Sequence, residues 1–280
     1  MGDYKPLTLM NWTGGKVQLR KLISEYIPNE LFKVWCEPFG GAGSMLFYKQ
    51  KWGEKEVYND LDGRLYNLFK VVKYHPREFY RQFRGSVCTD EEWYDYKFSS
   101  PQTDIQRAAR FYYMIRRSFG GKGVVPGRCY KGKKTWLSDG DGVKNISERI
   151  KDVTVEGKDY ADIFAQYDSP DTFFYLDPPY DGSNFRYYTE KNKGPFDQEK
   201  FRDAVKNLKG RWLMSNADTP NIRKLWAGFS QVTFQRHLGI NHAADIGREK
   251  VFGEILVASY DIEGVKSNTP LFNNQKGLNL

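Results

Sequence analysis

Short apolar runs alternate with amphipathic periodicities along most of this chain of 280 residues. Runs that predict strands lie at 33–36, 56–58, 153–155, 172–176, 211–214, 231–236 and 254–260. Apolar residues at helical spacing predict helices within 16–28, at 45–50, across most of 62–118, at 201–208 and from Thr219-Pro220 onward. Because strands and helices alternate, the pattern predicts an α/β sheet whose strands are joined by crossovers.

The stretch between the second and third predicted strands differs from the rest of the chain. It is mostly helical in pattern and ends in a glycine-rich loop at 119–140. We therefore predict one α/β domain, residues 1–64 and 150–262, interrupted by a mainly helical insertion at 65–149. The final segment, 263–280, is polar, and we expect it to be a mobile tail.

Composition narrows the class of protein. Apolar residues at 40% and aromatic residues at 16% suffice to fill a core. No apolar run approaches the roughly 20 residues of a membrane span, and the amino terminus lacks the apolar stretch of a secretion signal. The three cysteines and three histidines lack the spacing of metal ligands, so we expect a reducing compartment, no disulfide framework and no metal site.

Positive charge is concentrated in one window, residues 107–137. This basic window holds nine lysines and arginines and no acidic residue, whereas the whole chain carries a net charge of +8. The rest of the chain is therefore slightly negative. Aromatic residues and glycines lie between the cations, a combination that suits the binding of phosphates and stacking on bases. We expect the window to bind nucleic acid; a solvated basic surface without a ligand is the alternative.

A glycine-rich segment at 37–43 lies between the first predicted strand and the helix predicted after it. Glycines at such a turn let the backbone approach a cofactor closely, although a plain tight turn is the alternative. Leu46 stands where dinucleotide-binding sequences have their third glycine. Asp60 follows the second strand, where a carboxylate accepts hydrogen bonds from the two hydroxyls of a ribose. This pair of features favours an adenosine-containing cofactor.

The segment Asp177-Pro178-Pro179-Tyr180 directly follows the strongest predicted strand. The carboxyl end of a buried strand borders the ligand crevice of an α/β sheet. The Asp177 carboxylate and the Pro178 carbonyl offer two acceptors for the two hydrogens of an exocyclic amine. The Tyr180 ring offers a face on which a planar base stacks. The segment therefore predicts a site for an amino group on a base.

These segments together resemble the DNA adenine methylase family, the alpha group of S-adenosylmethionine-dependent amino-methyltransferases. The similar motifs follow the family's order along nearly the whole chain: Trp12, Gly14, Gly15 and Lys16; Phe39, Gly41 and Gly43; Asp60; residues 115–121; Asp177 to Tyr180; and Ser215, Asn216 and Asp218. The resemblance implies a Rossmann-like methyltransferase sheet with helices on both faces. It also implies that the inserted helical segment, 65–149, is a DNA-recognition domain.

Roles for individual residues follow from the same resemblance. The cofactor-binding residues are expected to be Trp12, Lys16, Phe39, Gly41, Gly43, Asp60, Asp159 and Asp177. The catalytic residues are expected to be Asp177, Pro178 and Tyr180. Contacts with DNA are expected from Arg116, Arg117, Lys122, Arg128, Lys131, Lys133 and Lys134. The family's asparagine before the recognition arginine is Ile115 here, so no particular recognition sequence is implied.

The expected activity is transfer of a methyl group from S-adenosylmethionine to N6 of an adenine flipped out of double-stranded DNA, which leaves S-adenosylhomocysteine. The resemblance implies no metal, no membrane and no obligate protein partner. It implies a cytoplasmic, nucleoid-associated enzyme of a bacterial, archaeal or phage-infected cell, of the kind found in restriction-modification.

Three other functions remain open on the sequence alone. An N4-cytosine or RNA adenine methyltransferase would use the same site. A NAD-dependent dehydrogenase is disfavoured by the missing third glycine and by the segment 177–180. A catalytically silent DNA-binding protein is disfavoured by the intactness of that segment.

Overall fold

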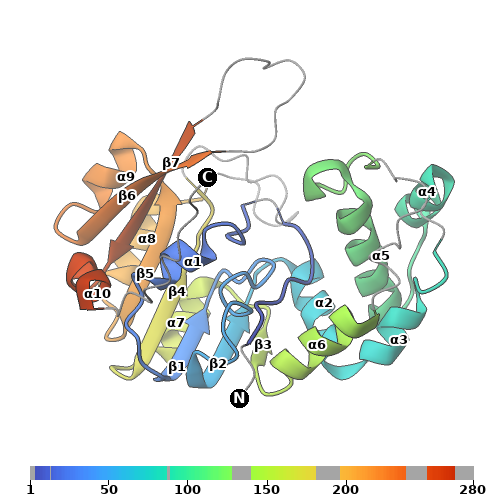
Figure 1. Cartoon of the computed structure of the whole chain (residues 1–280), viewed down its shortest axis with the longest axis horizontal. Helices are drawn as coiled ribbons and strands as arrows, with labels where there is room; N and C mark the ends of the chain where they lie inside the picture. The colour runs from blue at the N-terminus through green and yellow to red at the C-terminus, as the bar shows by residue number, and fades with distance from the viewer. Residues whose placement is uncertain are drawn as a thin grey trace, which may run out of the picture.

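The computed structural model describes residues 4–12, 14–86, 89–127, 140–180, 196–237 and 251–268. Within these ranges seven strands form one sheet in the order β3-β2-β1-β4-β5-β7-β6. Their bounds are β1 (Phe32–Glu37), β2 (Gly53–Asn59), β3 (Thr154–Glu156), β4 (Thr172–Leu176), β5 (Arg211–Ala217), β6 (Ser230–His237) and β7 (Val251–Ala258). Neighbouring strands are parallel except for β7, which is antiparallel to β5 and β6. The predicted α/β, Rossmann-like sheet is confirmed (Figure 1).

Helices cover both faces of the sheet, as predicted. Successive strand residues point to opposite faces, so each face has its own apolar core. Cys36, Phe174 and Met214 belong to one core, which is covered by α7 (Tyr160–Tyr167), α8 (Gln198–Val205) and α9 (Pro220–Leu225). Their neighbours Trp35 and Phe173 belong to the other core, which is covered by α1 (Arg20–Ser24) and α10 (Ile262–Asn268).

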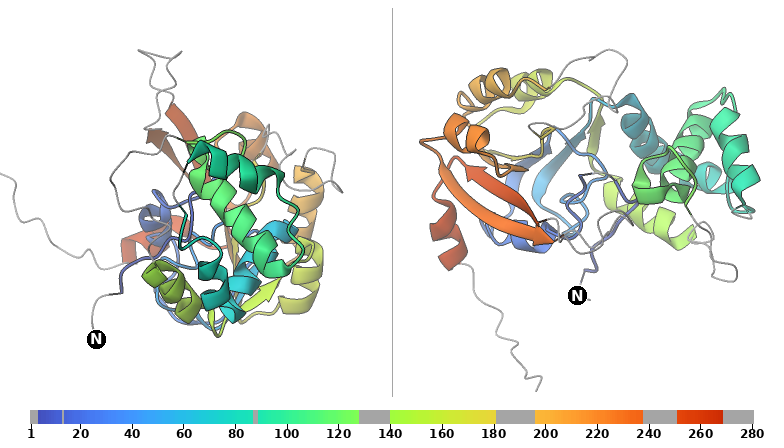
Figure 2. Two further views of the ribbon diagram at one scale, coloured as in Figure 1. Left: turned by 90° about the vertical axis from the view of Figure 1, so that its right-hand side faces the viewer. Right: turned by 90° about the horizontal axis from the view of Figure 1, so that it is seen from above.

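A group of helices between β2 and β3 lies beside the β3 edge of the sheet (Figure 1, Figure 2). It comprises α2 (Gly63–Tyr74), α3 (Pro76–Arg81), α4 (Asp90–Phe98), α5 (Asp104–Arg117), the 3-10 turn η1 (Phe119–Gly121) and α6 (Gly140–Ile150). Their apolar core is continuous with Ala42, Leu46 and Phe47, which follow the glycine segment. The predicted helical stretch is present; its separation into a recognition domain at 65–149 stays a prediction. In the described part of the chain, no helix is long and apolar enough to cross a membrane.

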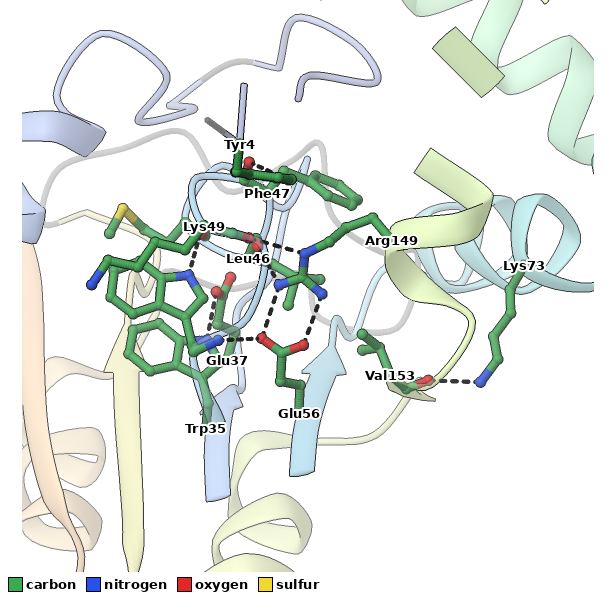
Figure 3. Close-up of polar contacts among 12 residues, drawn as sticks. Tyr4, Trp35, Glu37, Leu46, Phe47, Lys49, Glu56, Lys73, Arg149 and Val153 are labelled. Atoms are coloured by element: carbon green, nitrogen blue, oxygen red, sulfur yellow. Dashed lines mark hydrogen bonds and ion pairs between the residues drawn. The ribbon is translucent and has the colours of Figure 1, made fainter. Parts of the chain in front are cut away.

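Arg149 of α6 ties this helical group to the sheet, as Figure 3 shows. Its guanidinium donates to both carboxylate oxygens of Glu56 on β2, at 2.7 and 2.8 Å. It also donates to the backbone carbonyls of Leu46 at 2.6 Å and Lys49 at 3.0 Å. The side chains of Arg149 and Glu56 are 4% and 6% exposed, so this ion pair is buried. The segment after the glycine turn is thereby held between α6 and β2.

The helix predicted at 45–50 is wrong, because this stretch forms turns. The Tyr48 N–H donates to the Met45 carbonyl three residues back, at 2.9 Å, as in a turn. Side chains from outside the stretch hold these turns: the Trp52 indole donates to Met45, and Arg149 donates to Leu46 and Lys49. A helix that the pattern did not predict, α7, begins after Asp159.

The polar tail predicted at 263–280 is also corrected, since α10 occupies its first part. Ile262 is fully buried, and its N–H donates to the Ser230 hydroxyl at 3.1 Å. Lys266 donates to the Tyr26 hydroxyl at 3.0 Å. These contacts attach the segment to the sheet, while residues 269–280 lie outside the described residues.

Candidate active site

Loops carrying the predicted site residues meet at the carboxyl edge of the sheet. The segments 38–43, 60–62, 157–159 and 177–180 follow β1, β2, β3 and β4 respectively. Chain order runs outward from β1 to β3 on one side and from β4 to β5 on the other. The boundary between β1 and β4 is thus the switch point at which open α/β sheets bind ligands. The topology brings together four segments that lie far apart in sequence.

Asp177 is held by two donors from other parts of the chain. The Lys16 ammonium lies 2.8 Å from Oδ1 and 2.9 Å from Oδ2, and the Ser215 hydroxyl donates to Oδ1 at 2.9 Å. Lys16 is 2% exposed and Asp177 is 20% exposed, so one side of the carboxylate still faces solvent. Among the described contacts Oδ2 receives one donor and Oδ1 two. Oδ2 therefore retains a lone pair for a further donor such as an amine.

Lys16 uses all three of its N–H groups within the protein. Besides Asp177 it donates to the carbonyl of Gly14 at 2.8 Å. The family resemblance implies that Lys16 binds the cofactor, whereas the geometry joins it first to Asp177. In the sequence, Ser215 stands out only as part of a motif. Its contact depends on the alignment of β5 with β4, which no local pattern contains.

Tyr180 and the prolines complete the end of β4. The Tyr180 hydroxyl donates to Glu254 on β7 at 2.6 Å, and the Lys16 ammonium lies 4.6 Å from the centre of its ring. Burial and the neighbouring carboxylates raise the pKa of Tyr180 well above its usual value, so its phenol stays protonated. The Pro179 carbonyl accepts from Gln198 at 2.8 Å. Among the described residues none donates to the Pro178 carbonyl, which leaves that oxygen available as an acceptor.

The glycine turn lies against the segment that carries Trp12. Gly41 has a φ of +52°, and a side chain there would meet the Trp12 indole at 3.4 Å. Gly43 has a φ of +70°, and a Cβ there would lie 2.6 Å from the Phe47 ring, so both positions favour glycine. Trp12 itself makes an edge-to-face contact with Phe111 of α5. The turn therefore borders both the amino-terminal segment and the helical group.

Asp60 is oriented by backbone N–H groups. Its Oδ1 accepts from Asp62 at 2.8 Å and its Oδ2 from Gly41 at 2.9 Å. Burial raises the pKa of Asp60 to about 7, against the lowering effect of these two hydrogen bonds. Each oxygen keeps a lone pair, so the carboxylate suits a pair of adjacent hydroxyls such as those of a ribose.

Phe39 and Asp159 lie on the side of the site near β3. The Phe39 ring packs in an aromatic cluster with Tyr160, Phe196 and Phe201. Asp159 caps α7 by accepting from the Ala161 N–H at 2.9 Å.

Asn59 is a buried residue that the sequence analysis did not identify as part of this region. Its side chain donates to the carbonyls of Pro38 and Lys158 at 2.8 and 2.9 Å and accepts from the Lys158 N–H at 2.8 Å. It therefore fixes the loops after β1 and β3 to each other.

The predicted DNA-contacting residues have different surroundings. Arg117 is 4% exposed and donates to the Gly127 carbonyl at 2.8 Å, so its side chain supports the loop after α5. Arg116 is half-buried, with its guanidinium 5.9 Å from the centre of the Tyr112 ring, and Lys122 is exposed. The other four predicted contacts, Arg128, Lys131, Lys133 and Lys134, lie outside the described residues.

One part of the basic window, the loop that follows α5, lies next to the site. A Cβ on Gly121, whose φ is +69°, would come within 2.9 Å of the carbonyl oxygen of Asn11. The residue after Asn11 is Trp12, at the glycine turn. The loop that carries Lys122 therefore packs against the segment that leads to Trp12 and Lys16.

Comparison with known proteins agrees with this arrangement. The sequence profile of one family, described as D12 class N6 adenine-specific DNA methyltransferase, matches residues 12–238. The Type II methyltransferase M.CviBI of Paramecium bursaria Chlorella virus NC1A is 26% identical over 263 residues, which cover 90% of this chain and 99% of the relative. The Type II methyltransferase M1.LlaDCHI of Lactococcus lactis subsp. cremoris is 29% identical over 283 residues, with 92% and 96% coverage. The Type II methyltransferase M.MjaIII of Methanocaldococcus jannaschii is 28% identical over 294 residues, with 92% and 100% coverage.

Proposed function

The chain belongs to the D12 class of N6 adenine-specific DNA methyltransferases, and on that premise we propose which of its residues bind the cofactor, the adenine and the DNA. The family implies S-adenosylmethionine, whose sulfonium makes the methyl group electrophilic when the cofactor is bound. The donor set at the sheet edge fits this molecule. Asp60 offers acceptors for ribose hydroxyls, and the glycine turn, which carries no side chain at Gly41, lies against the Trp12 ring.

The cofactor would lie across the ends of β1 and β2. Gly41 and Gly43 let the backbone approach it, and Asp60 accepts from its ribose. Trp12 lines the turn, and Phe39 and Asp159 border the side nearer β3. Lys16 carries the positive charge nearest to the catalytic carboxylate and attracts the carboxylate at the methionyl end of the cofactor.

The catalytic step rests on Asp177, Pro178 and Tyr180. The N6 amine of adenine is a weak nucleophile because its lone pair is conjugated with the ring. The Asp177 carboxylate and the Pro178 carbonyl accept hydrogen bonds from the two N–H groups of this amine. These bonds draw the nitrogen toward a tetrahedral geometry and direct its lone pair at the methyl group. A carboxylate is too weak a base to deprotonate the amine beforehand. Asp177 would instead stabilise the positive charge that develops on N6 as the N–C bond forms and the bond between the methyl group and the cofactor sulfur breaks. S-adenosylhomocysteine would be the leaving group, and the proton would then pass to solvent.

The adenine must leave the duplex to reach this site, because N6 takes part in base pairing. Tyr180 would stack on the flipped base. One face of its ring is turned toward the Lys16 ammonium, so the base is expected on the other face. The proposal therefore requires a ring that is fixed relative to Asp177.

Double-stranded DNA would bind along the basic window 107–137, with Arg116, Lys122 and the cations at 128–134 as contacts and Arg117 as support for the loop. Replacing Lys131, Lys133 and Lys134 together with alanine should reduce the slope of log K against log salt by up to about 3, since each phosphate contact contributes about 0.9. An unchanged slope would remove these residues from the DNA surface.

The single observation that carries the proposal is the Asp177 carboxylate, held at the switch point with an acceptor position open. The full chain should be expressed in a host without DNA methylation and the genomic DNA analysed by long-read sequencing and nucleoside mass spectrometry. The expected product is N6-methyladenine in a defined sequence context, with RNA unmodified. N4-methylcytosine, or N6-methyladenine confined to RNA, would contradict the proposal.

A further inference from the structure

Glu254 is a buried acidic residue at the edge of the site, and the methyl-transfer chemistry assigns it no part. It is 4% exposed and accepts a hydrogen bond of 2.6 Å from the Tyr180 hydroxyl. Its place follows from the sheet register, in which it pairs with Ala217 on β5 and Phe234 on β6. Because β7 is antiparallel to β5, its early residues lie at the carboxyl edge of the parallel strands, where the segment 177–180 begins.

We propose that Glu254 is a positioning residue that fixes the Tyr180 ring in the orientation needed to stack on the flipped adenine. The inference rests on the proposed stacking role of Tyr180. It adds a residue from the last strand of the sheet to a site otherwise built from the amino-terminal segment and the ends of β1 to β5.

The geometry around Tyr180 restrains its ring at two points. The hydroxyl is fixed by a short, charge-assisted hydrogen bond to a carboxylate that is itself on a strand. The face is fixed by the Lys16 ammonium, 4.6 Å from the ring centre. Lys16 also binds both oxygens of Asp177, so the stacking ring and the amine acceptor belong to one connected set.

This connection affects the rate because methyl transfer depends on how the amine of the stacked base is aligned with Asp177. A base stacked on a rotated ring would carry its amine away from Asp177, and displacements on the order of 1 Å cost about a hundredfold in rate. The phenol remains a donor at neutral pH, since burial and the nearby carboxylates raise the pKa of Tyr180 well above its usual value. The hydrogen bond to Glu254 therefore persists over the range in which the enzyme would work.

A double-mutant cycle tests the inference with Tyr180→Phe, Glu254→Leu and the double variant, because leucine removes the acceptor that a glutamine would keep. Each single change should lower kcat about tenfold, with KM for DNA altered less than about threefold, and the double variant should lose about tenfold as well. The fluorescence of 2-aminopurine at the target position should also shift in both single variants, because stacking on Tyr180 changes. A loss of about a hundredfold in the double variant, or full kcat in Glu254→Leu, would overturn the inference.

A matched control comes from another tyrosine–glutamate pair. The Tyr167 hydroxyl of α7 donates to Glu156 of β3 at 3.0 Å, and Tyr167→Phe should leave kcat unchanged. Binding of S-adenosylhomocysteine by calorimetry checks that each variant is folded. The Tyr180→Ala variant distinguishes the stacking role of Tyr180 from the positioning role of Glu254. Full activity in Tyr180→Ala would refute the stacking role itself, whereas an inactive Tyr180→Ala beside a fully active Glu254→Leu would refute the role of Glu254 alone.

Discussion

The ammonium of Lys16 binds both carboxylate oxygens of Asp177, at 2.8 and 2.9 Å, although 161 positions separate the two residues in the chain. This pair joins the amino-terminal segment to the end of β4. It also determines how much of the carboxylate remains open to an incoming amine. The Lys16–Asp177 pair is therefore the contact on which the geometry of the site most depends.

Replacing Lys16 with methionine should reduce kcat about a hundredfold, because Asp177 loses the charge that orients it. The measurement is steady-state methyl transfer, with circular dichroism as a check on folding. Lys21, an exposed lysine at the end of α1, supplies the matched control Lys21→Met, which should retain its rate. A Lys16→Met variant within threefold of the parent enzyme would show that Asp177 needs no such partner.

Asp60→Asn should weaken binding of S-adenosylhomocysteine about tenfold or more, as measured by calorimetry. An amide places an NH₂ where Asp60 now accepts from the Gly41 or Asp62 N–H, so two donors would face each other. Asp168 offers a control, since it also accepts from two backbone N–H groups, those of Lys209 and Gly210. If Asp168→Asn weakens binding as much as Asp60→Asn does, the assignment of Asp60 to the ribose fails.

Arg149→Met should lower the free energy of unfolding by about 3–5 kcal/mol, because the change leaves the Glu56 carboxylate buried without its counter-charge. Denaturant titration measures this loss. Arg107 forms an exposed pair with Asp104, which solvent screens, and Arg107→Met should leave the free energy of unfolding almost unchanged. Equal losses of unfolding free energy in the two variants would mean that the buried Arg149 contacts with β2 stabilise the protein no more than an exposed ion pair does.

The stability of the protein should fall as pH rises, in part through Glu37. This residue lies at the end of β1, accepts from the Trp35 indole at 2.9 Å, and burial raises its pKa from 4.5 to about 8. A group that binds its proton more tightly when folded stabilises the protein fully below pH about 4.5, and this stabilisation is lost as the pH rises through about 8.

Urea titrations between pH 5 and 9 test this prediction. The Glu37→Gln variant cannot ionise, so its free energy of unfolding should vary less with pH over that window. Asp104→Asn, at an exposed position, serves as the control. Parallel pH dependences in the parent protein and the Glu37→Gln variant would exclude Glu37 as the source.

Elements that carry a local signal, such as a run of apolar residues or a capping residue, were predictable from the sequence. The strand at 172–176 was predicted to the residue because every one of its side chains is buried. The strand β2 was predicted as 56–58 but begins at Gly53. Its first residues were missed because Glu54 and Lys55 are exposed and polar, so they give no apolar signal. Thr219-Pro220 marked the start of α9 correctly, because the cap and the proline act locally.

Elements fixed by distant side chains were not predictable in this way. The turns at 45–50 are held by Trp52 and Arg149, which donate to the carbonyls of Met45 and Leu46 from outside the stretch. In the site, Asp177 and Tyr180 were found because they belong to one contiguous segment. The contacts of Ser215 and Glu254 were not, because they depend on how β5 and β7 align with the end of β4.

The most direct test of the proposed chemistry compares Asp177→Ala with the parent enzyme in a tritiated-methyl assay, with digestion of the duplex and identification of the labelled nucleoside. Asp171→Ala is the control, since that exposed residue lies just before the other end of β4 and pairs with Lys33. The parent enzyme and Asp171→Ala should both produce labelled N6-methyladenine. The Asp177→Ala variant should bind DNA with unchanged affinity and transfer no methyl group. Transfer at a near-parental rate by Asp177→Ala would contradict the catalytic role assigned to this carboxylate.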